Sequence, residues 1–163
     1  MEDFWGILGG TKRYSDRIFT PDQSSLFWSD LGETGGQANL DVTWVRAKDY
    51  YPNLTLFGDG YSPDDVHQGE IGNCWFMSSV ASMAEDPMRV KSLFLNTDNQ
   101  LNANGIYAVN LYALGVPHTV IIDDYIPLEK GTYNTYSPAF GKIGADNSLW
   151  GVLIEKAFAK FHG

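Results

Sequence analysis

The sequence is poor in cysteine, because Cys74 is the only one among 163 residues. A single thiol excludes any disulfide within the chain, and such a chain is typical of a reducing compartment. No run of about eighteen apolar residues occurs, so no membrane span is expected. Residues 1–18 also lack the apolar core of a signal peptide. These absences together predict a cytoplasmic protein.

Basic residues are scarce as well: eleven lysines and arginines stand against twenty aspartates and glutamates, which gives a formal charge of −9. Binding to nucleic acid requires lysines and arginines that cluster along the phosphate backbone. Here they are scattered along the chain, so we expect no nucleic-acid partner. An acidic excess also serves solubility in general, and it therefore identifies no ligand by itself.

Apolar and aromatic residues are plentiful, at 44% and 14% of the chain. This composition excludes a disordered protein, and the length suffices for one compact domain with its own core. No internal repeat and no change of composition divides the chain. We expect an N-terminal lead-in over residues 1–18 and a single α+β domain over residues 19–163.

Helices are indicated where apolar residues recur at spacings of three and four. One helix begins near Cys74, with an apolar face formed by Phe76, Met77, Val80, Met83 and Ala84. Another runs from about residue 147 to 161. A shorter helix is expected over residues 88–94, because Pro87 suits a first helical turn.

Strands are expected at residues 40–46 and, as an antiparallel pair, at 106–114 and 118–126 around a turn at 115–117. Residues 57–73 and 130–145 are rich in glycine and polar side chains, and both are predicted to be loops. The sequence thus predicts a small antiparallel sheet with a central helix and a C-terminal helix.

Cys74 is the first candidate for chemistry. A lone cysteine is most often a small buried apolar residue. At a helix start, however, the positive end of the helix dipole and unpaired N–H groups favour the nucleophilic thiolate. Gln68, six residues upstream, could offer its amide to an oxyanion together with the backbone N–H of Cys74. Gly72 would let the backbone approach a substrate, and Trp75 would wall the cleft.

Residues 68–76, Gln-Gly-Glu-Ile-Gly-Asn-Cys-Trp-Phe, resemble the active-site signature of the calpain family of papain-like cysteine proteases. That signature reads Gln-Gly-x-x-Gly-[Asp/Asn]-Cys-Trp. Further segments of the chain resemble the family's opening segment, its Trp-x-Arg turn, and its late strand and closing helix: residues 19–26, 44–46, 123–127 and 150–160. The resemblance covers about residues 19–163.

The resemblance implies the first lobe of the protease core, with Cys74 as nucleophile and Gln68 in the oxyanion hole. It also implies a protein substrate. The family's catalytic His and Asn belong to a second lobe, in Gly-His-Ala and Asn-Pro-Trp contexts that are absent here. We do not expect the chain's own histidines, His67, His118 and His162, to replace that base. A second lobe, in the same longer chain or in a partner chain, would have to supply it, and this chain alone is predicted to be inactive.

Residues 58–65, Gly-Asp-Gly-Tyr-Ser-Pro-Asp-Asp, are rich in the oxygen ligands that Ca²⁺ prefers. They do not match the ligand spacing of an EF-hand. They resemble the first-lobe calcium loop of calpains, which implies carbonyl ligands from Gly58 and Gly60 and a carboxylate ligand from Asp65.

The family's distal calcium ligand is a Glu, and Ser148 stands at its position. This change removes one negative charge, for which Asp146 could compensate from two residues away. Calcium binding and a simple turn held by an Asp cluster both remain open from the sequence.

Two functions follow from these residues. The first is the nucleophile-bearing lobe of an intracellular calcium-dependent cysteine endopeptidase, which hydrolyses peptide bonds through a thioester. The second is a non-catalytic calpain-like module that docks to another protein. Retention of Gln68 and Cys74 favours the first, whereas the missing lobe and Ser148 favour the second.

Overall fold

A computed structural model describes residues 4–26, 41–66, 73–131 and 135–162. Within these ranges the α-helices are α1 (Phe4–Leu8), α2 (Ala47–Tyr50), α3 (Cys74–Ala84), α4 (Pro87–Leu93) and α5 (Trp150–His162). The strands are β1 (Val42–Arg46), β2 (Ile106–Ala113), β3 (Val116–Asp123), β4 (Tyr125–Lys130) and β5 (Tyr136–Pro138). Short 3₁₀ helices span Gln23–Ser25 and Pro63–Asp65. The predicted α+β class is confirmed.

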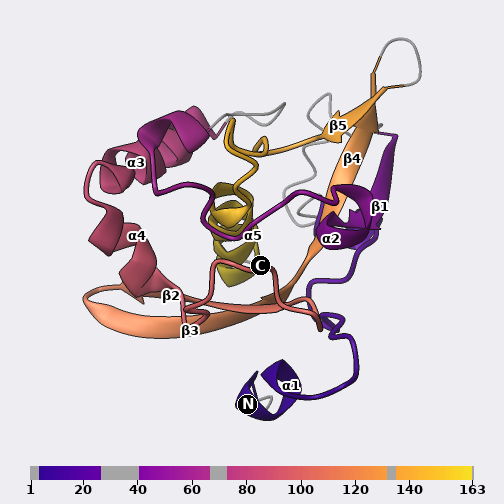
Figure 1. Cartoon of the computed structure of the whole chain (residues 1–163), viewed down its shortest axis with the longest axis horizontal. Helices are drawn as coiled ribbons and strands as arrows, with labels where there is room; N and C mark the ends of the chain where they lie inside the picture. The colour runs from indigo at the N-terminus through magenta and orange to yellow at the C-terminus, as the bar shows by residue number, and fades with distance from the viewer. Residues whose placement is uncertain (1–3, 27–40, 67–72, 132–134, 163) are drawn as a thin grey trace.

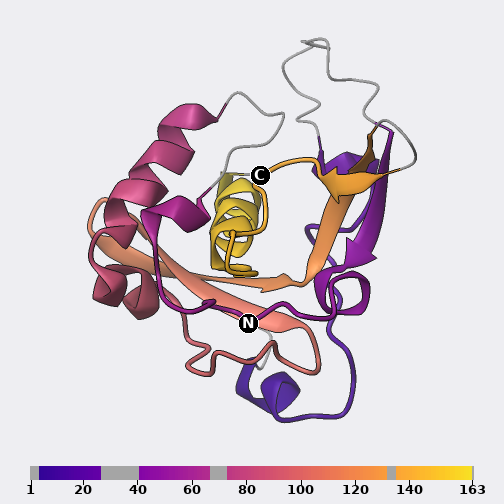
Figure 2. The same cartoon turned by 45° about the horizontal axis from the view of Figure 1, so that its top comes forward.

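Helix α5 occupies the centre of the molecule (Figure 1). Helices α3 and α4 lie on one side of it, and the sheet that contains β1 and β4 lies on the other; Figure 2 shows the same arrangement from a second direction. Every residue from Trp150 to Ala157 is buried, so the first two turns of α5 contact protein on all sides. No helix in the described ranges is both long enough and apolar enough to cross a bilayer.

The strands form two antiparallel units. In the first, β4 lies between β1 and β5. In the second, β2 pairs with β3 from Ile106 opposite Asp123 to Ala113 opposite Val116. Val120 and Ile122 of β3 belong to the main core, while Ile121 packs against a smaller cluster around Ile106. Both faces of the hairpin are therefore partly covered, which explains the continuous apolar run at this point.

The hairpin turn differs from the sequence prediction. It consists of Leu114 and Gly115, with φ angles of 51° and 78°, and Val116 and Pro117 already belong to β3. Positive φ at both positions is typical of the two-residue turn whose twist matches a hairpin. The predicted strand at 118–126 is likewise split, because the chain leaves the hairpin at Asp123 and enters the other sheet at Tyr125.

The predicted loop at residues 130–145 contains the short strand β5. Pro138 of this strand lies opposite Leu128 in β4. Three residues that include a proline have no recognisable strand pattern, so pairing with β4 alone defines β5.

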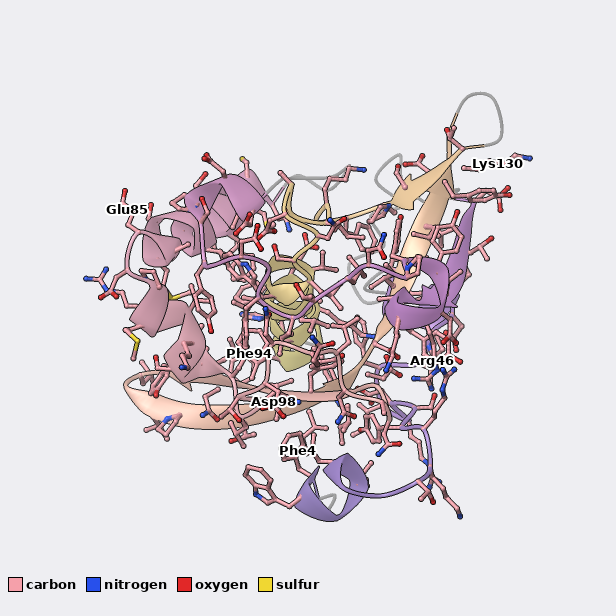
Figure 3. All side chains as sticks on the ribbon, in the orientation of Figure 1. Phe4, Arg46, Glu85, Phe94, Asp98 and Lys130 are labelled. Atoms are coloured by element: carbon pink, nitrogen blue, oxygen red, sulfur yellow. The ribbon has the colours of Figure 1, made fainter. Side chains whose placement is uncertain are left out.

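The N-terminal segment packs against the rest of the molecule. Phe4 lies on the side of α1 that faces the hairpin (Figure 3) and joins Tyr14, Ile106 and Ala108 in the smaller apolar cluster. Asp16 is 2% exposed and accepts a hydrogen bond of 2.6 Å from Lys160 in α5. The described part of the predicted lead-in is thus attached to the domain by both apolar and charged contacts.

Candidate active site

Cys74 is the first residue of α3, as the sequence predicts. The preceding carbonyl, that of Asn73, accepts hydrogen bonds from the N–H groups of Phe76 at 2.9 Å and Met77 at 3.1 Å. The thiol is exposed to solvent. Cys74 is therefore not a buried packing residue, and it lies exposed at the end of a helix where the N–H groups have no intrahelical partner.

Trp75 lies beside the thiol with 62% of its surface exposed. Its ring contacts the ring of Phe158 in α5 edge to face, with centroids 5.7 Å apart, and that of Phe76 at 5.8 Å. A large exposed ring held by two partners is suited to forming one wall of a cleft.

Gln68, Gly72 and His67 lie outside the described residues. The predicted roles of Gln68 in the oxyanion hole and of Gly72 in the substrate cleft therefore stay predictions.

The two described histidines occupy structural positions. His118 lies exposed on β3, with its ring 5.3 Å from that of Phe161. At the end of α5, Nδ1 of His162 is 3.0 Å from the carbonyl oxygen of Phe158. Neither ring forms a hydrogen bond to Cys74 in the described ranges, so neither is placed to act as a base for this predicted nucleophile.

Sequence reasoning missed one contact next to the nucleophile. Asn73 donates from Nδ2 to Oε1 of Glu155 at 2.6 Å, and the N–H of Gly141 donates to Oε2 of the same carboxylate at 2.6 Å. Burial raises the pKa of Glu155, although both hydrogen bonds and the charge of Lys142 lower it in part. Nothing in the local pattern links these residues, because 82 positions separate Asn73 from Glu155.

The predicted calcium loop is held in a defined shape. Asp65 is 5% exposed, and its Oδ2 accepts the N–H of Ser62 at 2.8 Å. Ser62 accepts the N–H of Asp64 in return, which completes a capping box. Burial raises the pKa of Asp65, and the charge of Asp146 raises it further, whereas the hydrogen bond from the N–H of Ser62 lowers it.

Asp146 connects this loop to the segment ahead of α5. Its Oδ2 accepts the N–H of Asp59 at 2.8 Å, and its Oδ1 accepts the N–H of Ser148 at 3.0 Å. Gly58 has a φ of 63°, and a Cβ there would lie 1.6 Å from Oδ2 of Asp146. Only glycine fits at this position.

Asp65, Asp146 and Ser148 converge around Gly144. A Cβ on Gly144 would lie within 3.0 Å of an atom of each of the three side chains. Oγ of Ser148 is buried and has no hydrogen-bond partner among the described residues. The cluster has two carboxylates, and the described ranges contain no group of three or more His, Cys, Asp or Glu side chains that could hold a metal.

The two glycines that are predicted to offer carbonyl ligands, Gly58 and Gly60, differ in their surroundings. The oxygen of Gly58 accepts a hydrogen bond of 2.8 Å from Nδ2 of Asn99, which leaves one lone pair free. Gly60 is exposed, and a Cβ there would meet no atom within 4 Å.

Comparison with known proteins assigns the chain to a family. The sequence profile described as "Calpain family cysteine protease" matches residues 14–163, nearly the whole chain. The chain belongs to the calpain family of cysteine proteases. The predicted resemblance to this family is thereby confirmed.

Individual relatives agree with this assignment. The chain is 33% identical to "Calpain-type cysteine protease ADL1" of rice over 96% of its own length and 7% of the relative's. It is 30% identical to "Calpain-5" of Caenorhabditis elegans over 92% of the chain and 22% of the relative. For the human "Calpain-1 catalytic subunit", identity is 28% over 92% of the chain and 20% of the relative. The chain thus spans less than a quarter of each of these calpains.

Proposed function

We propose that this calpain-family chain is the nucleophile-bearing first lobe of a calcium-dependent cysteine endopeptidase that acts on cytoplasmic proteins. The observation that carries the proposal is the exposed thiol of Cys74 at the first position of α3. Residues 19–163 form the lobe in this proposal.

In the proposed reaction, the thiolate of Cys74 attacks the scissile carbonyl carbon. The backbone N–H of Cys74 and the amide of Gln68 stabilise the resulting oxyanion. The intermediate collapses to a thioester, and the leaving amine takes up the proton that a base had removed from the thiol. Water then hydrolyses the thioester, which releases the carboxylic acid and restores the thiol.

The base in this scheme comes from a second lobe, in the same longer chain or in a partner chain. An imidazole must approach within about 3 Å of the thiol to remove its proton. His118 and His162 instead contact Phe161 and Phe158. The isolated lobe is therefore inactive in this proposal.

The donor set around Asp65 and Asp146 fits a calcium ion. Their carboxylates, the hydroxyl of Ser148 and the carbonyls of Gly58 and Gly60 are all hard oxygen ligands. Calcium bound there would supply positive charge that links residues 58–65 to residues 144–148. It would take no part in bond breaking. The buried Oγ of Ser148, which converges with both carboxylates around Gly144, supports this assignment.

Hydrolysis of a protein substrate such as casein tests the proposal. A chain extended through a second lobe with His and Asn is expected to cleave casein when calcium is present. The 163-residue chain and an extended Cys74→Ala variant are expected not to. Hydrolysis that survives Cys74→Ala would refute the role of Cys74. An extended chain that binds proteins but never cleaves them would favour the docking-module function instead.

A further inference from the structure

Helix α3 begins without the cap that its sequence offers. Asparagine at the position before a helix normally accepts an N–H of the first turn through its side-chain oxygen. Asn73 occupies this position with φ −107° and ψ 28°, yet its side chain forms no cap hydrogen bond. Its amide donates to Glu155 instead, at 2.6 Å. The side chain of Asn73, next to Cys74, is thus hydrogen-bonded to α5 and does not cap its own helix.

The burial of the Glu155 side chain in α5 costs free energy. It is 8% exposed and belongs to the buried half of α5, where an ionised carboxylate loses most of its hydration. None of the salt bridges in the described ranges includes it. Its two oxygens accept the hydrogen bonds from Asn73 and Gly141. These two hydrogen bonds offset part of the free energy that the carboxylate loses by leaving water.

Gly141 lies between this carboxylate and Met77, with no room for a side chain of its own. A Cβ on Gly141 would lie 2.8 Å from Oε2 of Glu155 and 3.3 Å from Cε of Met77. Because Met77 belongs to the first turns of α3, the carboxylate, the loop and the helix start form one tightly packed group. A small displacement of Glu155 would therefore shift the residues at the beginning of α3.

The position of Asn73 sets the geometry of the first turn. Its carbonyl oxygen accepts the N–H groups of Phe76 and Met77, and its own peptide bond to Cys74 carries the N–H of the nucleophile. We propose that Glu155 is a positioning residue, which holds Asn73 and through it the backbone N–H of Cys74. The inference deepens the proposed function and rests on it, because this N–H is one of the two proposed oxyanion donors.

Amide hydrogen exchange, followed by NMR in the 163-residue chain, tests the positioning directly. Glu155→Ala is expected to speed exchange at Phe76 and Met77 about tenfold or more, since a charge-assisted hydrogen bond is lost. Val80 and Ala84, in later turns of α3, should change much less. Asn73→Ala removes the same contact from the other side, and should reproduce the pattern even if Glu155→Ala does not fold.

Two further variants separate positioning from general destabilisation. Glu155→Gln should restore slow exchange, because Asn73 can turn its amide and offer its unpartnered Oδ1 to the new NH₂ group. Lys156→Met removes the neighbouring buried charge of α5, which contacts Asp123 and Tyr125 rather than Asn73. It should not raise exchange selectively at Phe76 and Met77.

Activity provides an independent readout. In a chain extended by the second lobe, Glu155→Ala and Asn73→Ala are expected to lower kcat about tenfold and leave KM within about twofold, because oxyanion donors act in the transition state. Glu155→Gln should recover most of kcat.

Each result bears on the inference separately from the proposed function. Exchange that stays at the wild-type rate, or rises equally along α3, would overturn the positioning role, and so would an unchanged kcat in both alanine variants. If the extended wild-type chain cleaves no protein, the proposed function fails. The exchange measurements would still decide whether Glu155 holds the start of α3.

Discussion

The chain contains two pairs of neighbouring aspartates, and the two pairs have opposite surroundings. Asp123 ends the hairpin strand β3 and Asp124 follows it, and each forms a salt bridge with a basic side chain. Asp65 and Asp146 converge beside the loop at residues 58–65, and no lysine or arginine forms a salt bridge with them in the described ranges. Two carboxylates at short range repel each other when both are ionised, and a positive partner or a shared proton relieves this repulsion.

The first pair is neutralised internally. Arg46 donates to Asp124 at 2.6 Å and to the carbonyl of Tyr14 at 2.6 Å, and Lys156 contacts Asp123. Burial raises the pKa of Asp124 more than the charge of Arg46 lowers it. The pair therefore joins β1, the N-terminal segment and β3 at a real desolvation cost.

The second pair accepts hydrogen bonds from the N–H groups of Ser62, Asp59 and Ser148 in the part of the chain that the structure describes. This difference teaches that adjacent carboxylates in one chain serve different purposes. The first pair is neutralised within the described protein, whereas the second pair, which has no salt bridge there, is the one for which we propose a calcium ion.

The largest expected effect comes from breaking the first pair. Asp124→Ala leaves the buried charge of Arg46, whose side chain is 8% exposed, without its partner. We expect a loss of about 3–5 kcal/mol in the free energy of unfolding, measured by urea denaturation. Arg13→Ala is the matched control, because its pair with Asp49 is about half exposed and should contribute little. Equal losses in the two variants would contradict the contrast.

The next effect concerns calcium at the second pair. Calcium at about one hundred times its Kd should stabilise the lobe by about 2.7 kcal/mol if it binds only the folded state. Calorimetric titration and thermal unfolding both measure this. Asp146→Ala and Asp65→Ala should abolish the binding heat, whereas Glu85→Ala, which removes an exposed charge at the end of α3, should keep it. An absence of heat in the wild-type chain would refute the calcium site.

The smallest expected effect concerns Glu155, a buried carboxylate that forms no salt bridge among the described residues. Its pKa in the folded state is raised above the ordinary 4.5, so its protonated form favours folding. That contribution is full below pH 4.5 and is lost as the pH rises through the folded-state pKa. Glu155→Gln should therefore be at least as stable as the wild type at pH 7.

Thermal unfolding at several pH values checks this prediction. Any advantage of Glu155→Gln at neutral pH should shrink toward acidic pH, where the wild-type side chain is also neutral. The groups that face this carboxylate are Asn73, the N–H of Gly141 and the charge of Lys142. A variant that is less stable at pH 7 but not at acidic pH would contradict the predicted sign.

Much of the local structure was predictable from the sequence. The helix at Cys74, the helix after Pro87 and the C-terminal helix follow from apolar spacing and from proline, and all three lie near their predicted positions. The hairpin was found, but its turn was misplaced, because Gly115 fits either position of a short turn until the strand register is known. Strand β5 was missed for lack of any pattern.

By itself, the sequence determined the family and the helix that begins at Cys74, and it predicted Cys74 as the nucleophile, because a motif and an apolar periodicity are local properties of the chain. Only the tertiary structure decided which carboxylates are neutralised and what holds the nucleophile's helix. The contacts of Asp124 with Arg46 and of Glu155 with Asn73 span 78 and 82 residues. Pairs so distant leave no periodic signal, since they exist only once the sheet and α5 pack around them.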